Sequence, residues 1–111
     1  MKIYLASPYT NQDPEIVSAR VKAINAHAAL LMNQGHIVFS PISHSHYIAI
    51  ENNMPTTFEF WQKHNHDFIV WCNLVMVLRM NGWQESRGVV DEIRYAKSIN
   101  KKVMNDSWEE M

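Results

Sequence analysis

Short hydrophobic runs alternate with longer amphipathic stretches along the chain. Residues 2–6 (KIYLA) and 36–40 (HIVFS) are each followed by a proline within two residues, and both runs predict buried β-strands. Residues 74–78 (LVMVL) form the most hydrophobic run, and its lack of polar alternation predicts a strand buried on both faces. A last short strand is predicted at residues 102–104.

Between these strands, apolar residues recur at steps of three and four, which is the spacing of one helix face. A first helix is predicted to begin at residues 13–15 (DPE), which combine an N-cap, a first-turn proline and a first-turn acid, and to end at Gly35. A second helix is predicted to begin after Thr56 or Thr57, and a third covers residues 86–98. The apolar stripe of the first helix consists of Val17, Val21, Ile24, Ala28 and Leu31.

Large apolar side chains mark the second helix, and its two tryptophans are expected mostly in the core because they follow the helical spacing. The segment before this helix, residues 43–55, is polar, and we predict an irregular loop with at most one helical turn near residues 47–51. The large apolar residues of the helix are Phe60, Trp61, Phe68, Ile69 and Trp71.

Strands that alternate with helices at these lengths imply right-handed crossovers and a parallel sheet. We therefore predict a single α/β domain over residues 1–111, a flavodoxin-like or Rossmann-like three-layer sandwich with a four- to five-stranded parallel sheet. Ligands of such sheets bind beyond the carboxyl ends of the strands. This rule singles out three loops, at residues 7–12, 40–47 and 80–88.

The composition limits what such a domain binds. The chain has 111 residues, 47% of them hydrophobic, and its 10 basic and 11 acidic side chains give a formal charge of -1. This balance argues against a nucleic acid polymer or an anionic membrane as partner, because both select a basic surface. No apolar stretch is long enough for a leader or a membrane span, and the lone Cys72 forms no internal disulfide, so we expect a cytoplasmic protein. Cys72 is interpreted as a packed thiol.

Glu92 is the most informative residue of the third helix. It lies at the edge of the apolar stripe, four residues from both Gly88 and Ala96, and these small neighbours leave room for a ligand beside its carboxylate. The alternative is a residue at the rim of the core whose carboxylate reaches water. The neighbouring Asp91 points about 100° away, toward a solvated face where Arg87 and Arg94 are in reach.

Ser86 and Gly88 stand at the start of this same helix. A serine hydroxyl, the free amides of a first helical turn and the positive end of the helix dipole together suit a phosphate group. The alternative is that Ser86 acts only as the N-cap of the helix.

Histidines form two His-x-His pairs, at positions 44 and 46 and at positions 64 and 66. A pair on an extended segment can hold a metal ion, but the sequence fixes no third ligand. We therefore predict no metal site and interpret His44 and His46 as lining a substrate site or structuring a loop. Asp67 follows the second pair, either on the surface or as a buried functional acid. Trp83 either covers a base or sugar or makes a dimer contact.

Three segments together resemble the nucleoside 2-deoxyribosyltransferase-like superfamily, and most closely its small bacterial and phage members that begin with a KIYLASPYT-like strand. These segments are residues 3–9 (IYLASPY), 39–46 (FSPISHSH) and 82–88 (GWQESRG), the last leading to Glu92. The resemblance covers nearly the whole chain. It implies a small-molecule nucleoside or nucleotide substrate, no cofactor, and a homodimer or higher oligomer.

The resemblance also implies roles for single residues. Glu92 takes the place of the nucleophile, Tyr4 that of a tyrosine that positions this carboxylate and keeps it ionised, and Asp67 that of an acid that contacts the sugar and assists the leaving base. We expect the substrate to be lined by Ser7, Pro8, Tyr9, His44, His46, Trp83, Ser86 and Gly88.

Two subgroups of the superfamily differ six residues before the glutamate. Transferases carry an aspartate there, whereas 2′-deoxynucleoside 5′-phosphate N-hydrolases carry Ser-x-Gly, which this chain matches with Ser86 and Gly88. The resemblance therefore favours an N-glycosidase that acts on a (deoxy)nucleoside or its 5′-monophosphate. The first loop, residues 7–10, lacks the glycines and the arginine of those hydrolases. Base exchange by a deoxyribosyltransferase, a nucleotide-binding module without chemistry, and a metal-dependent hydrolase built on His44 and His46 remain as alternatives.

Overall fold

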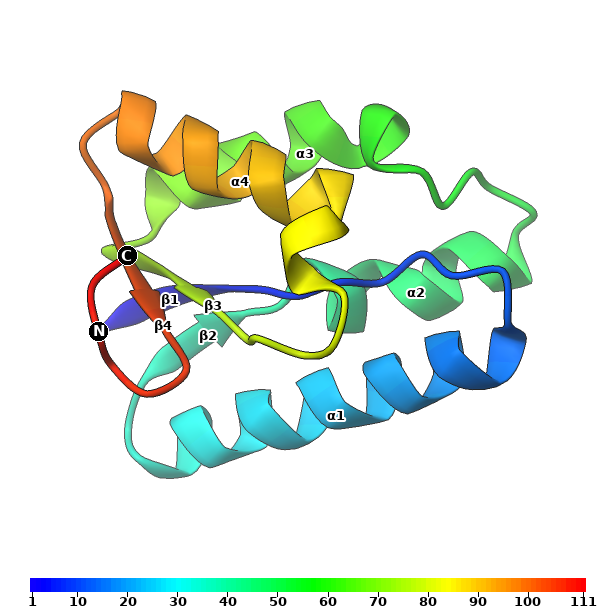
Figure 1. Cartoon of the computed structure of the whole chain (residues 1–111), viewed down its shortest axis with the longest axis horizontal. Coiled ribbons are helices and arrows are strands. Elements are labelled where there is room, and N and C mark those ends of the chain that lie inside the picture. The colour runs from blue at the N-terminus through cyan, green and yellow to red at the C-terminus, as the bar shows by residue number, and fades with distance from the viewer.

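The computed structural model describes all 111 residues and contains four strands, four α-helices and one 3-10 turn. The predicted alternation of strands and helices is confirmed (Figure 1). In chain order the elements are β1 (Lys2–Ala6), α1 (Pro14–Asn33), β2 (Ile37–Phe39), α2 (Pro41–Glu51), α3 (Phe58–Trp71), β3 (Leu74–Val77), η1 (Trp83–Glu85), α4 (Arg87–Ser98) and β4 (Lys102–Asn105).

The four strands form one parallel sheet in the order β2-β1-β3-β4. Tyr4 of the central strand β1 pairs with Phe39 on one side and with Val75 on the other. The chain therefore leaves β1 toward one edge of the sheet and later returns past it to build the other edge. This reversal between β1 and β3 is the place where a parallel α/β sheet binds its ligands.

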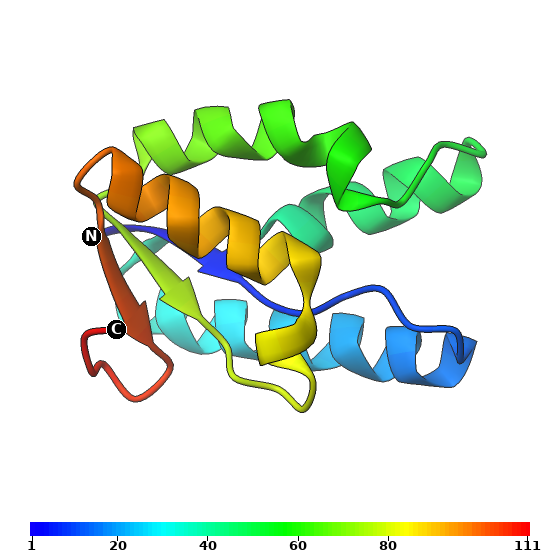
Figure 2. The same cartoon turned by 45° about the horizontal axis from the view of Figure 1, so that its top comes forward.

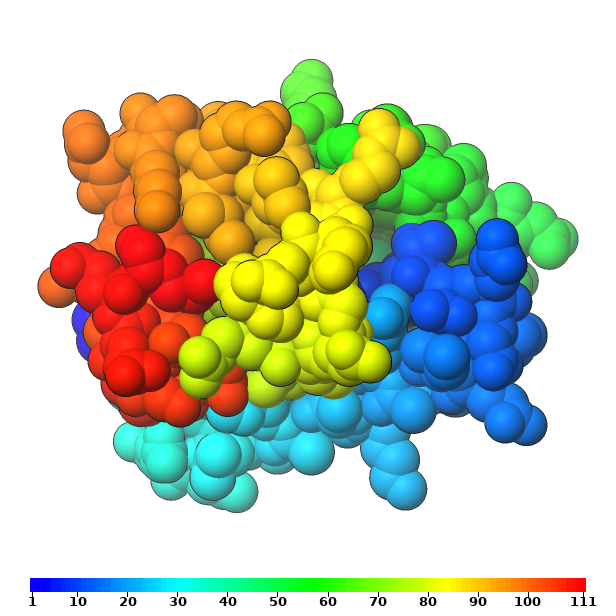
Figure 3. All heavy atoms as spheres, in the orientation of Figure 1, coloured from blue at the N-terminus to red at the C-terminus, as the bar shows by residue number.

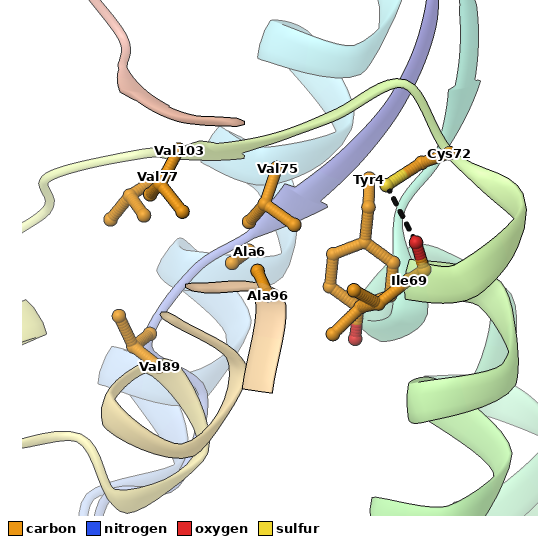
Figure 4. Packing of buried hydrophobic residues seen from close by; sticks show 9 residues of the cluster. All are labelled: Tyr4, Ala6, Ile69, Cys72, Val75, Val77, Val89, Ala96 and Val103. Atoms are coloured by element: carbon orange, nitrogen blue, oxygen red, sulfur yellow. Dashed lines mark hydrogen bonds between the residues drawn. The ribbon is translucent and has the colours of Figure 1, made fainter. Parts of the chain in front are cut away.

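Helices cover both faces of the sheet, as predicted for a three-layer sandwich (Figures 1 and 2). Because side chains alternate along a strand, Ile3 and Leu5 of β1 face α1, in a cluster that includes Ile24 and Leu31. The remaining positions face α3 and α4, where the second cluster forms (Figure 4). Its members are Tyr4, Ala6, Ile69, Cys72, Val75, Val77, Val89, Ala96 and Val103. Cys72 is the packed thiol expected, and its Sγ donates to the carbonyl of Ile69 at 3.0 Å.

The prediction of an irregular loop after the second strand was wrong for residues 43–51, because helix α2 begins directly at Pro41. Ser40 caps it, and its Oγ accepts a hydrogen bond from the Ser43 amide at 3.2 Å. Proline at the first helical position loses no intrahelical hydrogen bond and has the backbone angle that a helix needs. The pair Ser40-Pro41 after the second strand was thus the sequence signal for the start of α2.

The expectation that the tryptophans of the second helix are mostly core residues was also wrong. Of α3, Ile69 is the one fully buried residue, whereas Trp71 is 37% exposed and Phe60 51% exposed. Trp61 is partly buried, and its indole nitrogen donates to the carbonyl of Pro55 at 2.8 Å. α3 extends beyond the sheet at its N-terminal end (Figure 2), so its first turns do not cover the core.

The C-terminal segment folds back along the edge strand β4. The Met111 amide donates to the carbonyl of Val103 at 2.9 Å and the Asn105 amide to that of Glu109 at 2.8 Å. Pairing of this kind covers an otherwise open strand edge. No helix of the protein combines the length and the apolar character needed to cross a membrane.

Candidate functional site

A cavity of about 340 Å³ lies at the carboxyl end of the sheet. It is lined by the loop after β1, by α2, by the first turns of α3 and by the segment from η1 into α4. The surface is hollowed between the N-terminal loop, the η1–α4 segment and the start of α3 (Figure 3). Its volume is in the range of small-molecule sites, and it lies at the end of the sheet that the sequence analysis singled out.

The carboxylate of Glu92 forms the buried end of this cavity. Glu92 is 7% exposed, and its Oε2 accepts a hydrogen bond from the hydroxyl of Tyr4, which is fully buried on β1. Val89 and Ala96 on the same face of α4 pack into the core and fix the rotation of the helix. The alternative of a rim residue in water is therefore wrong, and the predicted pairing of Tyr4 with Glu92 is present in the structure.

Burial raises the pKa of Glu92 from its model-compound value of 4.5 to about 8. The hydrogen bond from Tyr4 lowers this pKa, but the loss of solvation outweighs it, and the nearby charge of Asp91 raises it further. Burial and the Glu92 charge likewise raise the pKa of the Tyr4 phenol, which keeps its proton. With a pKa of about 8, Glu92 is mostly protonated at neutral pH in the free protein, so the hydrogen bond from Tyr4 offsets the effect of burial only in part.

Ser86 begins α4 as its N-cap, and its Oγ accepts from the Val89 amide at 3.3 Å. The following amides, of Arg87 and Gly88, belong to the first helical turn and have no intrahelical acceptor. A β-carbon on Gly88 would lie 3.6 Å from the β-carbon of Phe58, so a small side chain would fit there without displacing α3. The start of α4 therefore presents amide donors and a hydroxyl to the cavity.

Two further polar groups come from the loop after β1 and from α2. Ser7 is 5% exposed and lines the cavity, and its Oγ has no hydrogen-bond partner within the protein. Tyr9 Oη lies 2.7 Å from Nδ1 of His46, and both residues line the cavity. A buried hydroxyl without a partner is uncommon in proteins, and Ser7 is thus available to a ligand.

The structure brings some of the sequence-predicted residues to the cavity and leaves others away from it. Pro8 is buried beside the cavity wall without lining it, and Trp83 packs against the core cluster of α3 and α4. His44 is exposed, with its ring against those of Phe39 and His64. The predicted residues that do line it are Ser7, Tyr9, His46, Ser86, Gly88 and Glu92.

The prediction of Asp67 as a residue of the site is not supported, because Asp67 is exposed on the outer face of α3 and does not line the cavity. Asn65, two residues earlier, does line it. Two residues along a helix correspond to about 200° of rotation, so the two side chains point to nearly opposite faces. Asn65 carries an amide, which binds polar groups of a ligand but supplies no ionisable proton.

The cavity residues at the start of α3 and Arg87 were not among the residues predicted from the sequence. Arg87 lies over the ring of Phe58, 4.6 Å from its centroid, and its Nη1 is 3.3 Å from Oε1 of Glu59. All three line the cavity. The position of Arg87 between Ser86 and Gly88 was a signal that could have placed it at the site.

Asp91 does not face the solvent beside Arg87, as the sequence suggested. It lies between α4 and α3, where Oδ2 is 2.7 Å from Nε2 of His66 and Oδ1 accepts from the amide of Gln62 at 2.8 Å. The ring of His66 also stacks on that of Tyr95, with 3.8 Å between centroids and 8° between planes. These interactions hold α3, which carries Asn65, against α4, which carries Glu92.

No three or more His, Cys, Asp or Glu side chains converge to a group that could hold a metal ion. The two histidines proposed for such a site are separated by their partners. The ring of His44 packs at a tilt against those of Phe39 and His64, whereas His46 forms a hydrogen bond with Tyr9.

Comparison with known proteins identifies the family of this chain and a solved structure with a similar fold. Residues 1–109 match the family described as a domain of unknown function, DUF1937. No curated protein matches the chain. Among solved structures, the chain is similar to the 2-deoxyribosyltransferase of the psychrotolerant bacterium Bacillus psychrosaccharolyticus, with 27% identity and a TM-score of 0.64 over 95% of this chain and 71% of that chain. The chain therefore belongs to the DUF1937 family and, as its sequence motifs indicated, to the nucleoside 2-deoxyribosyltransferase-like superfamily.

Proposed function

We propose that this protein is an enzyme that cleaves the base–sugar bond of a (deoxy)nucleoside or its 5′-monophosphate, with Glu92 as the nucleophile. The observation that carries the proposal is the buried Glu92 carboxyl group, held by Tyr4, at the inner end of a cavity of about 340 Å³. A carboxylate next to a glycosidic bond is the group that glycosidases use. The likeness to a 2-deoxyribosyltransferase supports glycosyl transfer of this kind.

In the proposed reaction the ionised Glu92 attacks the anomeric carbon as the bond to the base breaks. The transition state has oxocarbenium character, and the product is a glycosyl ester of Glu92. Because the free protein holds Glu92 protonated, the substrate complex must favour its ionised form. The positive charge that develops on the sugar favours the carboxylate, and the hydroxyl of Tyr4 stabilises it by its hydrogen bond.

The second step decides between a hydrolase and a transferase. Water resolves the ester in the hydrolase that we favour, and a second base resolves it in a deoxyribosyltransferase. Ser86 and Gly88 support the hydrolase, since the start of α4 offers amides and a hydroxyl to a 5′-phosphate. We expect Ser7 and Asn65 to bind hydroxyls of the sugar, and their position on the wall of the same cavity supports this.

The test is release of free base from a panel of ribo- and deoxyribonucleosides and their 5′-monophosphates, with and without a second base as acceptor. Glu92→Gln is expected to lower the rate of base release at least about 1,000-fold while leaving the fold intact, because the nucleophile is lost. Glu51→Gln, an exposed glutamate of α2 outside the cavity, is the matched control. If Glu92→Gln releases base as fast as wild type, Glu92 is not the nucleophile.

A second candidate is a nucleotide-binding module that performs no chemistry. The protonated state of Glu92 in the free protein favours it, because a neutral carboxyl group is a poor nucleophile. Calorimetry that detects binding of a nucleotide, together with no base release on long incubation, would establish this candidate instead.

We further propose that the protein is a homodimer or higher oligomer. Trp108 is 38% exposed near the C-terminus, and Tyr47, Ile48 and Ile50 are exposed on α2, so apolar surface is available for a contact between copies. Size-exclusion chromatography with light scattering measures the assembly, and the mass of a single 13.0 kDa chain would contradict it.

A further inference from the structure

Tyr9 and His46 form a hydrogen-bonded pair on the cavity wall. Tyr9 lies in the loop after β1 and His46 in the second turn of α2, so their contact joins two segments that are 37 residues apart. Oη of Tyr9 is 2.7 Å from Nδ1 of His46, and the rings meet edge to face, with 5.6 Å between centroids and 80° between planes. Both residues line the cavity that contains Glu92.

His46 is the one imidazole that lines this cavity. His44 is exposed on another face of α2, and His66 is bonded to Asp91 between α3 and α4. Three other polar groups of the cavity wall are less suited to deliver a proton inside the cavity, and one of them, Glu85 of η1, is exposed to solvent. Asn65 is an amide, and Glu59 is engaged with the guanidinium of Arg87 at 3.3 Å.

The contact with Tyr9 also determines which nitrogen of His46 is available. Nδ1 is occupied by the phenol, which leaves Nε2 as the nitrogen that can serve a ligand. A phenol both donates and accepts hydrogen bonds, so Tyr9 holds the ring in the same orientation whether Nδ1 is bare or protonated. Burial raises the pKa of the Tyr9 phenol, and Tyr9 therefore stays neutral in both states.

We propose that His46, held in place by Tyr9, is the residue that protonates the departing base and afterwards deprotonates the incoming water. His46 is then a catalytic residue of the reaction proposed above, and Tyr9 is a positioning residue. The inference rests on that proposed function and adds an acid–base group to the cavity that contains Glu92.

The protons balance through both steps. As Glu92 attacks the anomeric carbon, the electron pair of the breaking bond passes to the base, which takes the proton from Nε2 of the imidazolium. His46 is left neutral, with the Nδ1 proton donated to Tyr9 Oη. Water then attacks the glycosyl ester and gives its proton to Nε2, which restores the imidazolium, while Glu92 leaves as the carboxylate. The sum is one nucleoside and one water converted to one sugar and one base.

Glu92 must lose a proton to become a nucleophile, and His46 must gain one to become an acid. The two changes together leave the number of protons and the net charge of the cavity unchanged.

The test compares two substrates of the same sugar with wild type, His46→Gln and Tyr9→Phe. One is the nucleoside that wild type cleaves best, whose base needs a proton to leave, and the other is the corresponding 4-nitrophenyl glycoside, whose leaving group needs none. The readout is the rate of leaving-group release in a single turnover, which reports the first step alone and not the later attack of water. Loss of a general acid lowers this rate by about 100- to 10,000-fold. We expect His46→Gln to show this loss on the nucleoside and a change of less than about 5-fold on the nitrophenyl glycoside. Tyr9→Phe is expected to show a smaller loss with the same dependence on leaving group.

His44→Gln is the matched control, because it removes a histidine of the same helix that lies outside the cavity, and it should act like wild type on both substrates. Equal losses by His46→Gln on both substrates would mean that His46 only binds or structures the site, and would overturn the inference. Full activity of His46→Gln on the nucleoside would overturn it too. If the proposed enzymatic function itself is wrong, the result is distinguishable from these outcomes. Wild type would then release no leaving group from either substrate, and Glu92→Gln would change nothing.

Discussion

Tyr4 and Glu92 are 88 residues apart in the chain, and the phenol of the first donates a hydrogen bond to the carboxyl group of the second. Tyr4 belongs to the central strand β1, and Glu92 to the helix α4 that covers it. The contact places one ionisable group at the inner end of the cavity, where solvent is excluded and its pKa is raised to about 8. The chemistry of the site therefore depends on how strongly Tyr4 offsets this loss of solvation.

Tyr4→Phe removes that hydrogen bond and keeps the aromatic ring in the core. The pKa of Glu92 is expected to rise further above 8, because the bond from Tyr4 is what lowers it in the wild type. A hydrogen bond to a charged group contributes about 1.5–3 kcal/mol, so the rate of base release should fall about 10- to 100-fold. A carbon-13 NMR titration of the glutamate carboxyl groups measures the pKa, and the resonance absent from Glu92→Gln assigns it. An unchanged pKa in Tyr4→Phe would contradict this account.

Glu92→Gln is expected to make the protein more stable at alkaline pH. In the unfolded chain Glu92 ionises near 4.5, and in the folded protein near 8, so the folded state holds an extra proton between these values. This contribution of Glu92 to stability is complete below about pH 4.5 and is lost as the pH rises through about 8. Glutamine has no such titration and still accepts the hydrogen bond of Tyr4.

Glu92→Gln should therefore increase the free energy of unfolding by on the order of 3–4 kcal/mol at pH 8 and by less than about 1 kcal/mol at pH 5. Urea unfolding of both proteins at the two pH values measures it. A difference in stability that does not change with pH would show that Glu92 is ionised in the folded protein. Greater stability with lost activity is the expected combination for a buried functional carboxyl group.

Much of the fold followed from local patterns. The uninterrupted run of residues 74–78 predicted a strand buried on both faces, and Leu74–Val77 is that strand in the centre of the sheet. Asp13 caps α1 as expected, and its side chain accepts from the Glu15 amide at 2.9 Å. The helix at Pro41–Glu51 was missed because its outer face carries Tyr47, Ile48 and Ile50, which are exposed, so no single apolar stripe marks it.

The site was harder to predict than the fold. Glu92 was identifiable because an acid at the edge of an apolar stripe is unusual, and its spacing from Gly88 and Ala96 put it on the inner face of α4. The hydrogen bond from Tyr4, on the strand that α4 covers, joins residues 88 apart in the chain, and local patterns do not show it. Asp67 was assigned from the family resemblance, whereas Asn65 is the residue that lines the cavity. The rotation of α3, which tertiary packing sets, decides which side chain faces the cavity.

Substitutions of Asn65 and Asp67, two residues apart on α3, are expected to differ in their effect on kcat/KM. Asn65→Ala removes a polar side chain from the cavity wall and should lower kcat/KM by about 10-fold or more, since one hydrogen bond to the substrate is lost. Asp67→Asn changes an exposed residue and should leave kcat/KM within about 2-fold of wild type. Steady-state kinetics of base release measures both. A large loss in Asp67→Asn would restore the sequence-based assignment of Asp67.

The pair of His66 and Asp91 is expected to stabilise the packing of α3 against α4. Their side chains are 19% and 17% exposed, and the 2.7 Å contact is supported by Gln62 and by the stacked ring of Tyr95. His66→Ala and Asp91→Ala should each lower the free energy of unfolding by about 1–2 kcal/mol. A double-mutant cycle at pH 7 should give a coupling of about 1 kcal/mol. A coupling of zero would mean that the two side chains are neighbours without an energetic link.

Ser86→Asp separates the structural role of Ser86 from its proposed role in phosphate binding. Aspartate is as good an N-cap as serine, and its negative charge at the start of a helix is favourable, so the Val89 amide keeps its acceptor and α4 keeps its stability. The same charge repels a 5′-phosphate placed at the amides of Arg87 and Gly88. Like charges in contact cost several kcal/mol, so kcat/KM for a monophosphate should fall at least about 100-fold more than kcat/KM for the corresponding nucleoside. Equal changes for the two substrates would place the phosphate away from α4, and the hydrolase subgroup would then lose its support from Ser86.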